Sequence, residues 1–112
     1  MSRIYKILSR AEWDAARAAG SFQGSAVDLA DGYIHFSTAA QAQATAAKWF
    51  KGQDGLVVLE VEADDLPDLK WEPARGGDLF PHLYRPLDTS LVRAVRVAPL
   101  GEDGAPRVEV EA

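Results

Sequence analysis

Two histidines are the residues of this 112-residue chain best suited to chemistry. His35 lies in the segment Tyr-Ile-His-Phe-Ser-Thr at 33–38, where apolar and polar residues alternate as in a strand with one buried face. In a continuous strand His35 and Ser37 share one face, roughly 7 Å apart. Imidazole exchanges protons near neutral pH, and a hydroxyl donates or accepts a hydrogen bond. The pattern indicates a site, although a histidine satisfied on a half-buried strand explains it as well.

The second histidine, His82, lies in the aromatic-rich segment Leu-Phe-Pro-His-Leu-Tyr at 79–84. Two histidines among aromatic residues favour a shared pocket, which the sequence alone does not establish. Tyr84 and Trp71 are rings on which a ligand ring can stack, and packing in the core or at its rim is the alternative for each. We therefore take 33–38 and 79–84 as the two halves of one candidate site.

Composition limits the class of protein. The length predicts one domain over residues 1–112, and the absence of cysteine excludes disulfides and thiolate chemistry. The net charge of −5, without an obvious basic patch, argues against binding DNA or RNA but allows a small anionic ligand. No apolar run approaches the roughly 20 residues of a membrane span, and no signal peptide is visible. We expect a cytoplasmic protein without membrane association; the oligomeric state is open.

The elements that position the two segments follow from periodicity and capping. The patterns predict helices at 10–19 and 39–50 and strands at 3–8, 33–36, 55–62, 69–72, 80–84, 89–98 and 107–111. The last strand is expected to form a hairpin with 89–98, and 20–32 is expected to be irregular, with a short strand or turn near 26–29. Two helices in the first half and strands throughout indicate an α+β domain with an antiparallel or mixed sheet.

Local signals fix several helix ends and core positions. Ser9 and Glu12 fit a capping box that starts the first helix, and Gly20 suits its end. Trp13 is expected in the core, as are four residues of the second helix: Ala42, Ala46, Trp49 and Phe50. Ser37 or Thr38 is expected to cap that helix, whose N-terminus would offer backbone N–H groups to an anion beside His35.

The segments 32–38 and 80–84 resemble the small bacterial and plant family known as domain of unknown function 952. The likeness runs over roughly residues 3–98, from Ile4 and Tyr5 to the last long strand. This family is grouped with ADP-ribosyltransferase-like proteins, so the resemblance implies a split mixed or antiparallel sheet around a cleft, with two main helices in the N-terminal half. It also implies NAD as a possible substrate.

The resemblance further suggests roles for single residues. Ser37 and Thr38 match the central-strand hydroxyl of that superfamily, and Lys6 occupies a first-strand position where the family usually has histidine. No late glutamate is placed by the motifs; Glu72 and Glu109 are the choices, and Glu72 is preferred because it lies beside the second motif. The RNA 2′-phosphotransferases have a similar central segment, but their expected arginine cluster is missing.

Three functions are compatible with these residues. The first is an NAD-using transferase or glycohydrolase with His35, Ser37, Glu72 and His82 as catalytic residues. Its substrate would bind to Lys6, Thr38, Trp71 and Tyr84, with Glu72 stabilising a cationic transition state. The second is a module that binds a nucleotide or other small ligand without turnover. The third is an enzyme with a metal on His35, His82 and Glu72, for which no recognised ligand spacing exists, so no metal is expected.

Overall fold

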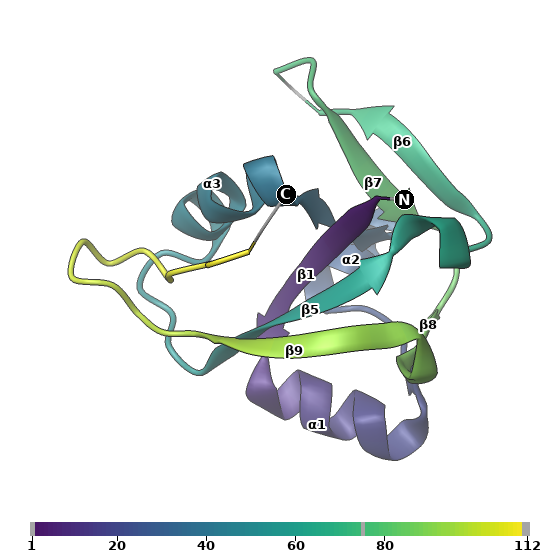
Figure 1. The fold of residues 1–112 in the computed structure, drawn as a ribbon, viewed down its shortest axis with the longest axis horizontal. Helices are drawn as coiled ribbons and strands as arrows, with labels where there is room; N and C mark the ends of the chain where they lie inside the picture. Colours follow the sequence, from purple (N-terminus) through teal and green to yellow (C-terminus); the bar gives the residue numbers. More distant parts are fainter. Residues whose placement is uncertain (1, 75, 111–112) are drawn as a thin grey trace.

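The computed structural model describes residues 2–74 and 76–110, which form two main antiparallel sheets with helices packed around them (Figure 1). In chain order the elements are β1 (Arg3–Ser9), α1 (Arg10–Ala19), β2 (Ser21–Phe22), α2 (Ala26–Asp31), β3 (Ile34–His35), β4 (Ser37–Thr38), α3 (Ala39–Trp49), β5 (Leu56–Glu62), η1 (Ala63–Asp65), β6 (Leu69–Pro73), β7 (Leu79–Leu83), β8 (Leu87–Asp88), η2 (Thr89–Leu91) and β9 (Val92–Ala98). The first sheet has the order β4-β1-β5-β9 and the second β3-β7-β6, while β2 and β8 form a small ribbon. All these pairings are antiparallel, so the described residues form an α+β fold and contain no parallel pair of a mixed sheet.

β1 and β5 form the centre of the first sheet and are covered on both faces. All seven residues of β5 are buried, as the aliphatic and β-branched content of 56–59 and Val61 predicts for five of them; Glu60 and Glu62 are buried as well. One face packs against α1 and the second sheet, through side chains such as Leu59, Trp13 and Phe36. The other face packs against α3 and the C-terminal segment, through Val58, Ala42 and their neighbours. Figure 1 shows α1 and α3 on separate sides of these strands.

Capping set the helix boundaries largely as the sequence predicts. Ser9 and Glu12 form the capping box of α1, which ends at Gly20 with φ +83°, a left-handed conformation that glycine adopts without strain. Thr38 caps α3 by accepting a hydrogen bond from the backbone of Gln41. The core position of Trp13 is confirmed, since its side chain is 5% exposed.

Trp49 does not lie in the core as predicted, because its side chain is 67% exposed at the last residue of α3. Ala42 and Ala46 are buried, and Phe50 packs against them as a half-buried residue. The buried stripe of α3 is therefore narrow and made of alanines. Trp49 instead carries the ammonium group of Lys48 over its ring, 5.0 Å from the ring centre.

Two other expectations about secondary structure are wrong. Residues 26–31 form the helix α2, not a strand or turn; six residues are too few for the periodicity of a helix to show. Residues 107–110 form no strand, and β9 pairs with β5 instead of forming a hairpin with them. Val108 is buried, and its N–H donates to Gln43 of α3 at 2.8 Å, so tertiary contacts replace strand pairing. The remainder of the expected strand, residue 111, lies outside the described residues.

The strand expected at 33–36 ends at His35, because at Phe36 the chain passes from the second sheet to the first. β3 pairs with β7 in the second sheet, and β4 pairs with β1 in the first. Phe36 is buried between them, and its N–H donates to the carbonyl of Pro81 at 3.0 Å. The strand predicted over 89–98 also differs, because 89–91 form the 3₁₀ turn η2 and β9 begins only at Val92. The crossing at Phe36 separates His35 from Ser37.

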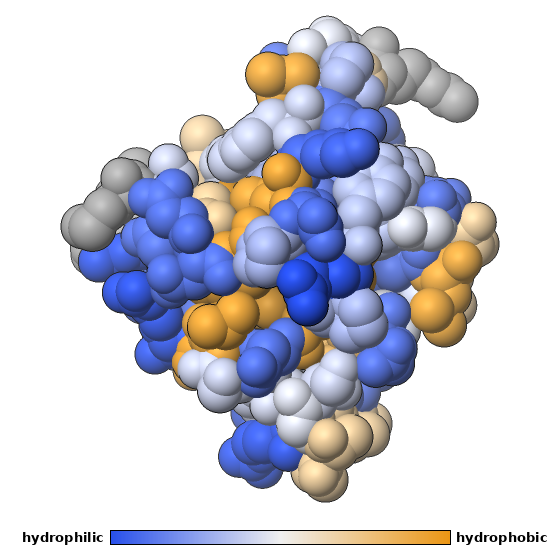
Figure 2. All heavy atoms as spheres, turned by 90° about the vertical axis from the view of Figure 1, so that its right-hand side faces the viewer, coloured by the Kyte–Doolittle hydropathy of each residue, from blue (hydrophilic) through white to orange (hydrophobic). Residues whose placement is uncertain are grey.

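The large exposed apolar side chains are spread over several elements. They include Val27, Leu29, Trp49, Trp71, Leu79, Val95, Val97 and Leu100. On the face drawn in Figure 2, hydrophobic atoms gather near the middle but hydrophilic side chains border and interrupt them. No helix in the described part of the chain is long and apolar enough to cross a bilayer.

Candidate functional site

His35 and His82 lie directly opposite one another on the paired strands β3 and β7. Their ring centres are 5.5 Å apart in an edge-to-face arrangement. Tyr33 stacks on His82 at 4.1 Å and lies 4.6 Å from His35, and Tyr84 lies 5.2 Å from Tyr33. The two segments singled out by their histidines thus meet in one cluster, held by the register of a single strand pair.

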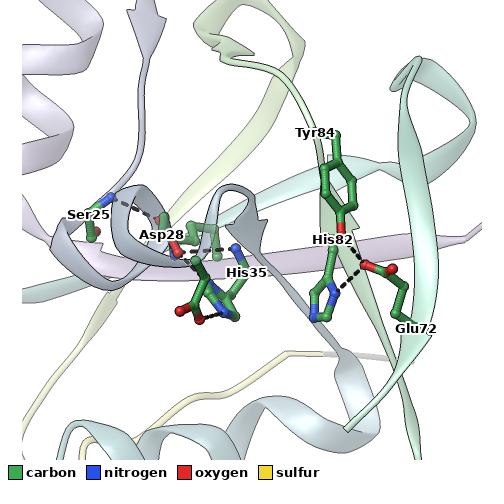
Figure 3. Close-up of polar contacts among 8 residues, drawn as sticks. Ser25, Asp28, His35, Glu72, His82 and Tyr84 are labelled. Atoms are coloured by element: carbon green, nitrogen blue, oxygen red, sulfur yellow. Dashed lines mark hydrogen bonds and ion pairs between the residues drawn. The ribbon is translucent and has the colours of Figure 1, made fainter.

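Asp28 of α2 holds His35 from the side (Figure 3). Its Oδ1 is 2.6 Å from Nδ1 of His35 and also accepts from the backbone N–H of His35 at 3.2 Å. Its Oδ2 accepts from the backbone N–H of Ser25 at 2.9 Å and lies 2.9 Å from the ammonium nitrogen of Lys6. The second ring nitrogen of His35, Nε2, is 2.9 Å from Oδ2 of Asp31. One buried carboxylate therefore connects β1, α2 and β3.

The charges in this network depend on one another. Burial alone raises the pKa of Asp28, but the hydrogen bond from His35 and the charge of Lys6 outweigh it and hold the pKa at about 2. Burial lowers the pKa of Lys6, and Asp28 opposes that shift. Both side chains are at most 5% exposed, so Asp28 is the main compensation for the lost hydration of Lys6, while His35 and Lys6 together compensate Asp28.

Asp28 also requires a close approach of the preceding loop. A Cβ at Gly24 would lie 2.9 Å from the Cβ of Asp28, and Gly24 has φ +123°. A side chain at this position would therefore clash as well as strain the backbone. Glycine at position 24 allows the loop to pass over the carboxylate and shield it from water.

Glu72 of β6 holds the second histidine. Its Oε1 lies 2.9 Å from Nδ1 of His82 and accepts from the hydroxyl of Tyr84 at 2.6 Å (Figure 3). The hydrogen bonds from Tyr84 and His82 lower the pKa of Glu72, and the same contact raises the pKa of Tyr84 to about 12. The ammonium group of Lys70 lies 5.0 Å from the centre of the Tyr84 ring. Both histidines thus present Nδ1 to a carboxylate.

The remaining residues predicted for the site lie elsewhere or have other contacts. Ser37 is buried, and its hydroxyl is 2.9 Å from that of Thr45 on α3, so it does not share a face with His35. Thr38 caps α3. Trp71 pairs with Pro81 and, by strand alternation, lies on the opposite face of the sheet from Glu72. Lys6 reaches the cluster only through Asp28. Of the eight, His35, His82, Glu72 and Tyr84 come together.

Three members of the cluster were not predicted as site residues from the sequence: Asp28, Asp31 and Tyr33. The Ser-Ala-Val-Asp segment at 25–28 fits the pattern of a helix start, and Gly32 suits a helix end, so α2 was detectable. Detecting that helix would have placed Asp28 and Asp31 on one element, but it would not have placed Asp28 against Lys6. The contact with Lys6 joins residues 22 positions apart and comes only from the tertiary fold.

A shallow hollow of about 240 Å³ adjoins the cluster on the side of Tyr33 and Tyr84. It is lined by Gln23, Asp28, Leu29, Gly32, Tyr33, Ile34, Leu83, Tyr84, Arg85 and Pro86. Sites for whole small ligands usually measure roughly 300–1,000 Å³, so this hollow suits one ring of a larger molecule. Its lining combines aromatic and aliphatic surface with the amide of Gln23, the carboxylate of Asp28 and the guanidinium group of Arg85.

No group of three or more metal-ligating side chains forms a metal site among residues 2–74 and 76–110. In particular, His35 and His82 each have a carboxylate at Nδ1, and the second nitrogen of His35 is also taken by Asp31. Of the three donors expected for a metal enzyme, His82 and Glu72 bind each other, and His35 binds Asp28 and Asp31. The arrangement suits proton transfer and hydrogen bonding to a ligand.

The fold and the site define a class of α+β domain with a cross-strand histidine pair, each ring held by a carboxylate. The chain belongs to the family described as protein of unknown function DUF952, whose model matches residues 7–95. It is similar to the crystal structure of protein CC0527 from Caulobacter crescentus, at 64% identity and a TM-score of 0.92, over 95% of this chain and 94% of that one. The solution NMR structure of CC0527 matches at 64% identity and a TM-score of 0.85, over 95% and 92% of the chains. No curated protein matches the chain.

Proposed function

We propose that the protein binds a nucleotide of the NAD class over the histidine pair and transfers its ADP-ribosyl group to a hydroxyl or to water. The observation that carries this proposal is the cross-strand pair itself, with ring centres 5.5 Å apart and surrounded by three carboxylates. Cleavage of the nicotinamide–ribose bond develops positive charge on the sugar, which nearby carboxylates stabilise. The proposal also draws on the family's grouping with ADP-ribosyltransferase-like folds.

The position of the pair supports the same proposal. It lies on β3 and β7, next to the point where the chain crosses between the two sheets at Phe36. A split sheet of this kind is what the resemblance leads us to expect. The hollow beside Tyr33 and Tyr84 has room for one ring of the nucleotide, with aromatic surface for stacking. The rest of a dinucleotide would lie across the exposed edge of the cluster.

A non-catalytic nucleotide-binding module is the second candidate. Two observations favour it: Glu72 already binds His82 and Tyr84, and Lys6 is buried against Asp28. A glutamate held in this way is less free to approach a ribose. This candidate uses the same surface and predicts binding without release of nicotinamide.

The first experiment records NMR chemical-shift changes on adding NAD or ADP-ribose to the wild type, to His35→Ala, and to Trp49→Phe as a matched control. Trp49 is an exposed aromatic residue outside the cluster. We expect shifts around His35, Glu72 and His82 in the wild type and the control, and their loss in His35→Ala. A nicotinamide-release assay then separates enzyme from binding module. Absence of shifts at millimolar ligand, with all three proteins folded, would reject a nucleotide site. The cytoplasmic location stays a prediction.

A further inference from the structure

The hydrogen bonds of His82 define which of its nitrogens carries a proton. Nδ1 faces Oε1 of Glu72 at 2.9 Å, and an ionised carboxylate only accepts hydrogen bonds, so Nδ1 carries hydrogen. Its other nitrogen, Nε2, has no hydrogen-bond partner among the described residues. A neutral ring in this tautomer presents the Nε2 lone pair to a ligand. This is how a carboxylate orients a histidine that acts as a general base.

His35 has the opposite arrangement, with a carboxylate oxygen at each ring nitrogen. Nδ1 is 2.6 Å from Asp28 and Nε2 is 2.9 Å from Asp31. Both contacts are hydrogen bonds only when both nitrogens carry hydrogen, which is the imidazolium cation. With Lys6 and His35 positive and the two aspartates negative, this half of the cluster is neutral overall. The remaining groups around it are Tyr33, Tyr84 and the Glu72–His82 pair.

The two aspartates differ in how firmly they are held. Asp28 is 1% exposed and contacts four donor groups, on Lys6, Ser25 and His35. Asp31 is 44% exposed at the end of α2, and among the described residues its carboxylate contacts only His35. An anionic ligand can therefore take the place of Asp31 at Nε2 of His35 without disturbing Asp28. The released N–H would donate to the ligand as a charge-assisted hydrogen bond.

We infer that the histidine pair is a complementary acid–base couple, in which neutral His82 accepts a proton from a hydroxyl and protonated His35 binds a phosphate of the same substrate complex in place of Asp31. This inference rests on the proposed function and deepens it. The substrate class is a nicotinamide dinucleotide with a phosphate of its pyrophosphate group at His35 and the acceptor hydroxyl at Nε2 of His82. The edge-to-face rings, 5.5 Å apart, bring the two groups side by side.

The chemical step then balances. The acceptor oxygen forms a bond to C1′ of the ribose while the bond from C1′ to the nicotinamide nitrogen breaks, and that electron pair leaves with neutral nicotinamide. The O–H proton of the acceptor passes to Nε2 of His82. The imidazolium so formed is stabilised by Glu72 and returns its proton to solvent after the product leaves.

The test measures the protonation of both rings directly. Two-bond ¹⁵N–¹H correlation spectra of ¹⁵N-labelled protein at pH 7 distinguish the two neutral tautomers and the imidazolium. We expect His82 neutral with hydrogen on Nδ1, and His35 with hydrogen on both nitrogens. Inorganic pyrophosphate is then added as the probe and should shift the His35 signals while leaving His82 neutral. A neutral His35, or His82 with hydrogen on Nε2 alone, would overturn the couple.

Variants separate the partners of each ring. Asp31→Asn removes the carboxylate that competes with phosphate and should tighten pyrophosphate binding about threefold to fivefold, the size of one exposed ion pair. Glu72→Gln should disturb the tautomer of His82 and leave pyrophosphate affinity unchanged. Equal or weaker pyrophosphate binding by folded Asp31→Asn would reject the phosphate role of His35. Correct histidine states without nicotinamide release would reject the proposed enzyme activity and leave the couple standing.

Discussion

Replacing Asp28 by asparagine removes the charge that holds the centre of the cluster together. Lys6 would then lie in the core at 4% exposure without its ion-pair partner, and His35 would lose the carboxylate at Nδ1. Removing one partner of a buried ion pair costs roughly 3–5 kcal/mol of unfolding free energy, against roughly 5–15 kcal/mol for a whole domain. At roughly 4 °C per kcal/mol for a domain of this size, the thermal midpoint should fall by about 12–20 °C.

The assay is thermal and urea unfolding followed by circular dichroism, with two comparison variants. Asp31→Asn changes the same atoms on the same helix at an exposed position and should cost less than about 1 kcal/mol. The double variant Lys6→Met, Asp28→Asn removes both charges and should recover part of the loss, giving a coupling of about 0.5–3 kcal/mol. If Asp28→Asn costs no more than Asp31→Asn, and the double variant is simply additive, the account of a buried charge network is refuted.

The remaining predictions address pH, the second histidine and the core. Folding lowers the pKa of Asp28 from 3.8 to about 2, so its ionised carboxylate adds about 2 kcal/mol to the unfolding free energy above pH 4. This contribution is lost as pH falls toward 2. The unfolding free energy of the wild type should therefore fall over this pH range in acid unfolding curves, and that of Asp28→Asn should lack this fall. Tyr84→Phe removes a hydrogen bond to Glu72, so an NMR titration should find the Glu72 pKa raised, and an unchanged value would contradict the 2.6 Å contact. Trp49→Gln should change the unfolding free energy by less than about 0.5 kcal/mol, whereas Trp13→Ala should lower it by roughly 3–5 kcal/mol. Equal losses in the two variants would contradict the burial of Trp13 and the exposure of Trp49.

Much of the framework was predictable because it depends on neighbours in the sequence. The capping box at Ser9, the left-handed Gly20 and the apolar run of β5 act within a few residues, and the structure has α1 and β5 nearly where they predict. The last expected strand failed for the opposite reason. Its alternation of valine and charge is compatible with a strand, but Val108 packs against the sheet and bonds to α3, which the local pattern does not contain.

The candidate site divides in the same way. Residue types alone pointed to His35 and His82, because imidazole is the side-chain group suited to proton exchange at neutral pH and both residues lie among aromatic residues. Ser37 was grouped with them on the assumption of one continuous strand. The crossing at Phe36 breaks the alternation of faces, and the hydroxyl turns to Thr45 of α3 instead.

The sequence by itself determined the helix ends, the buried central strands and the two segments that carry the histidines, since capping, periodicity and side-chain chemistry act over short distances. The tertiary structure alone decided that β3 and β7 pair in the register that sets His35 against His82. It also decided that Lys6, Asp28 and His35 form one network across three elements. Those contacts depend on how sheets and helices pack, and a buried charge finds its partner only when the whole core has excluded water.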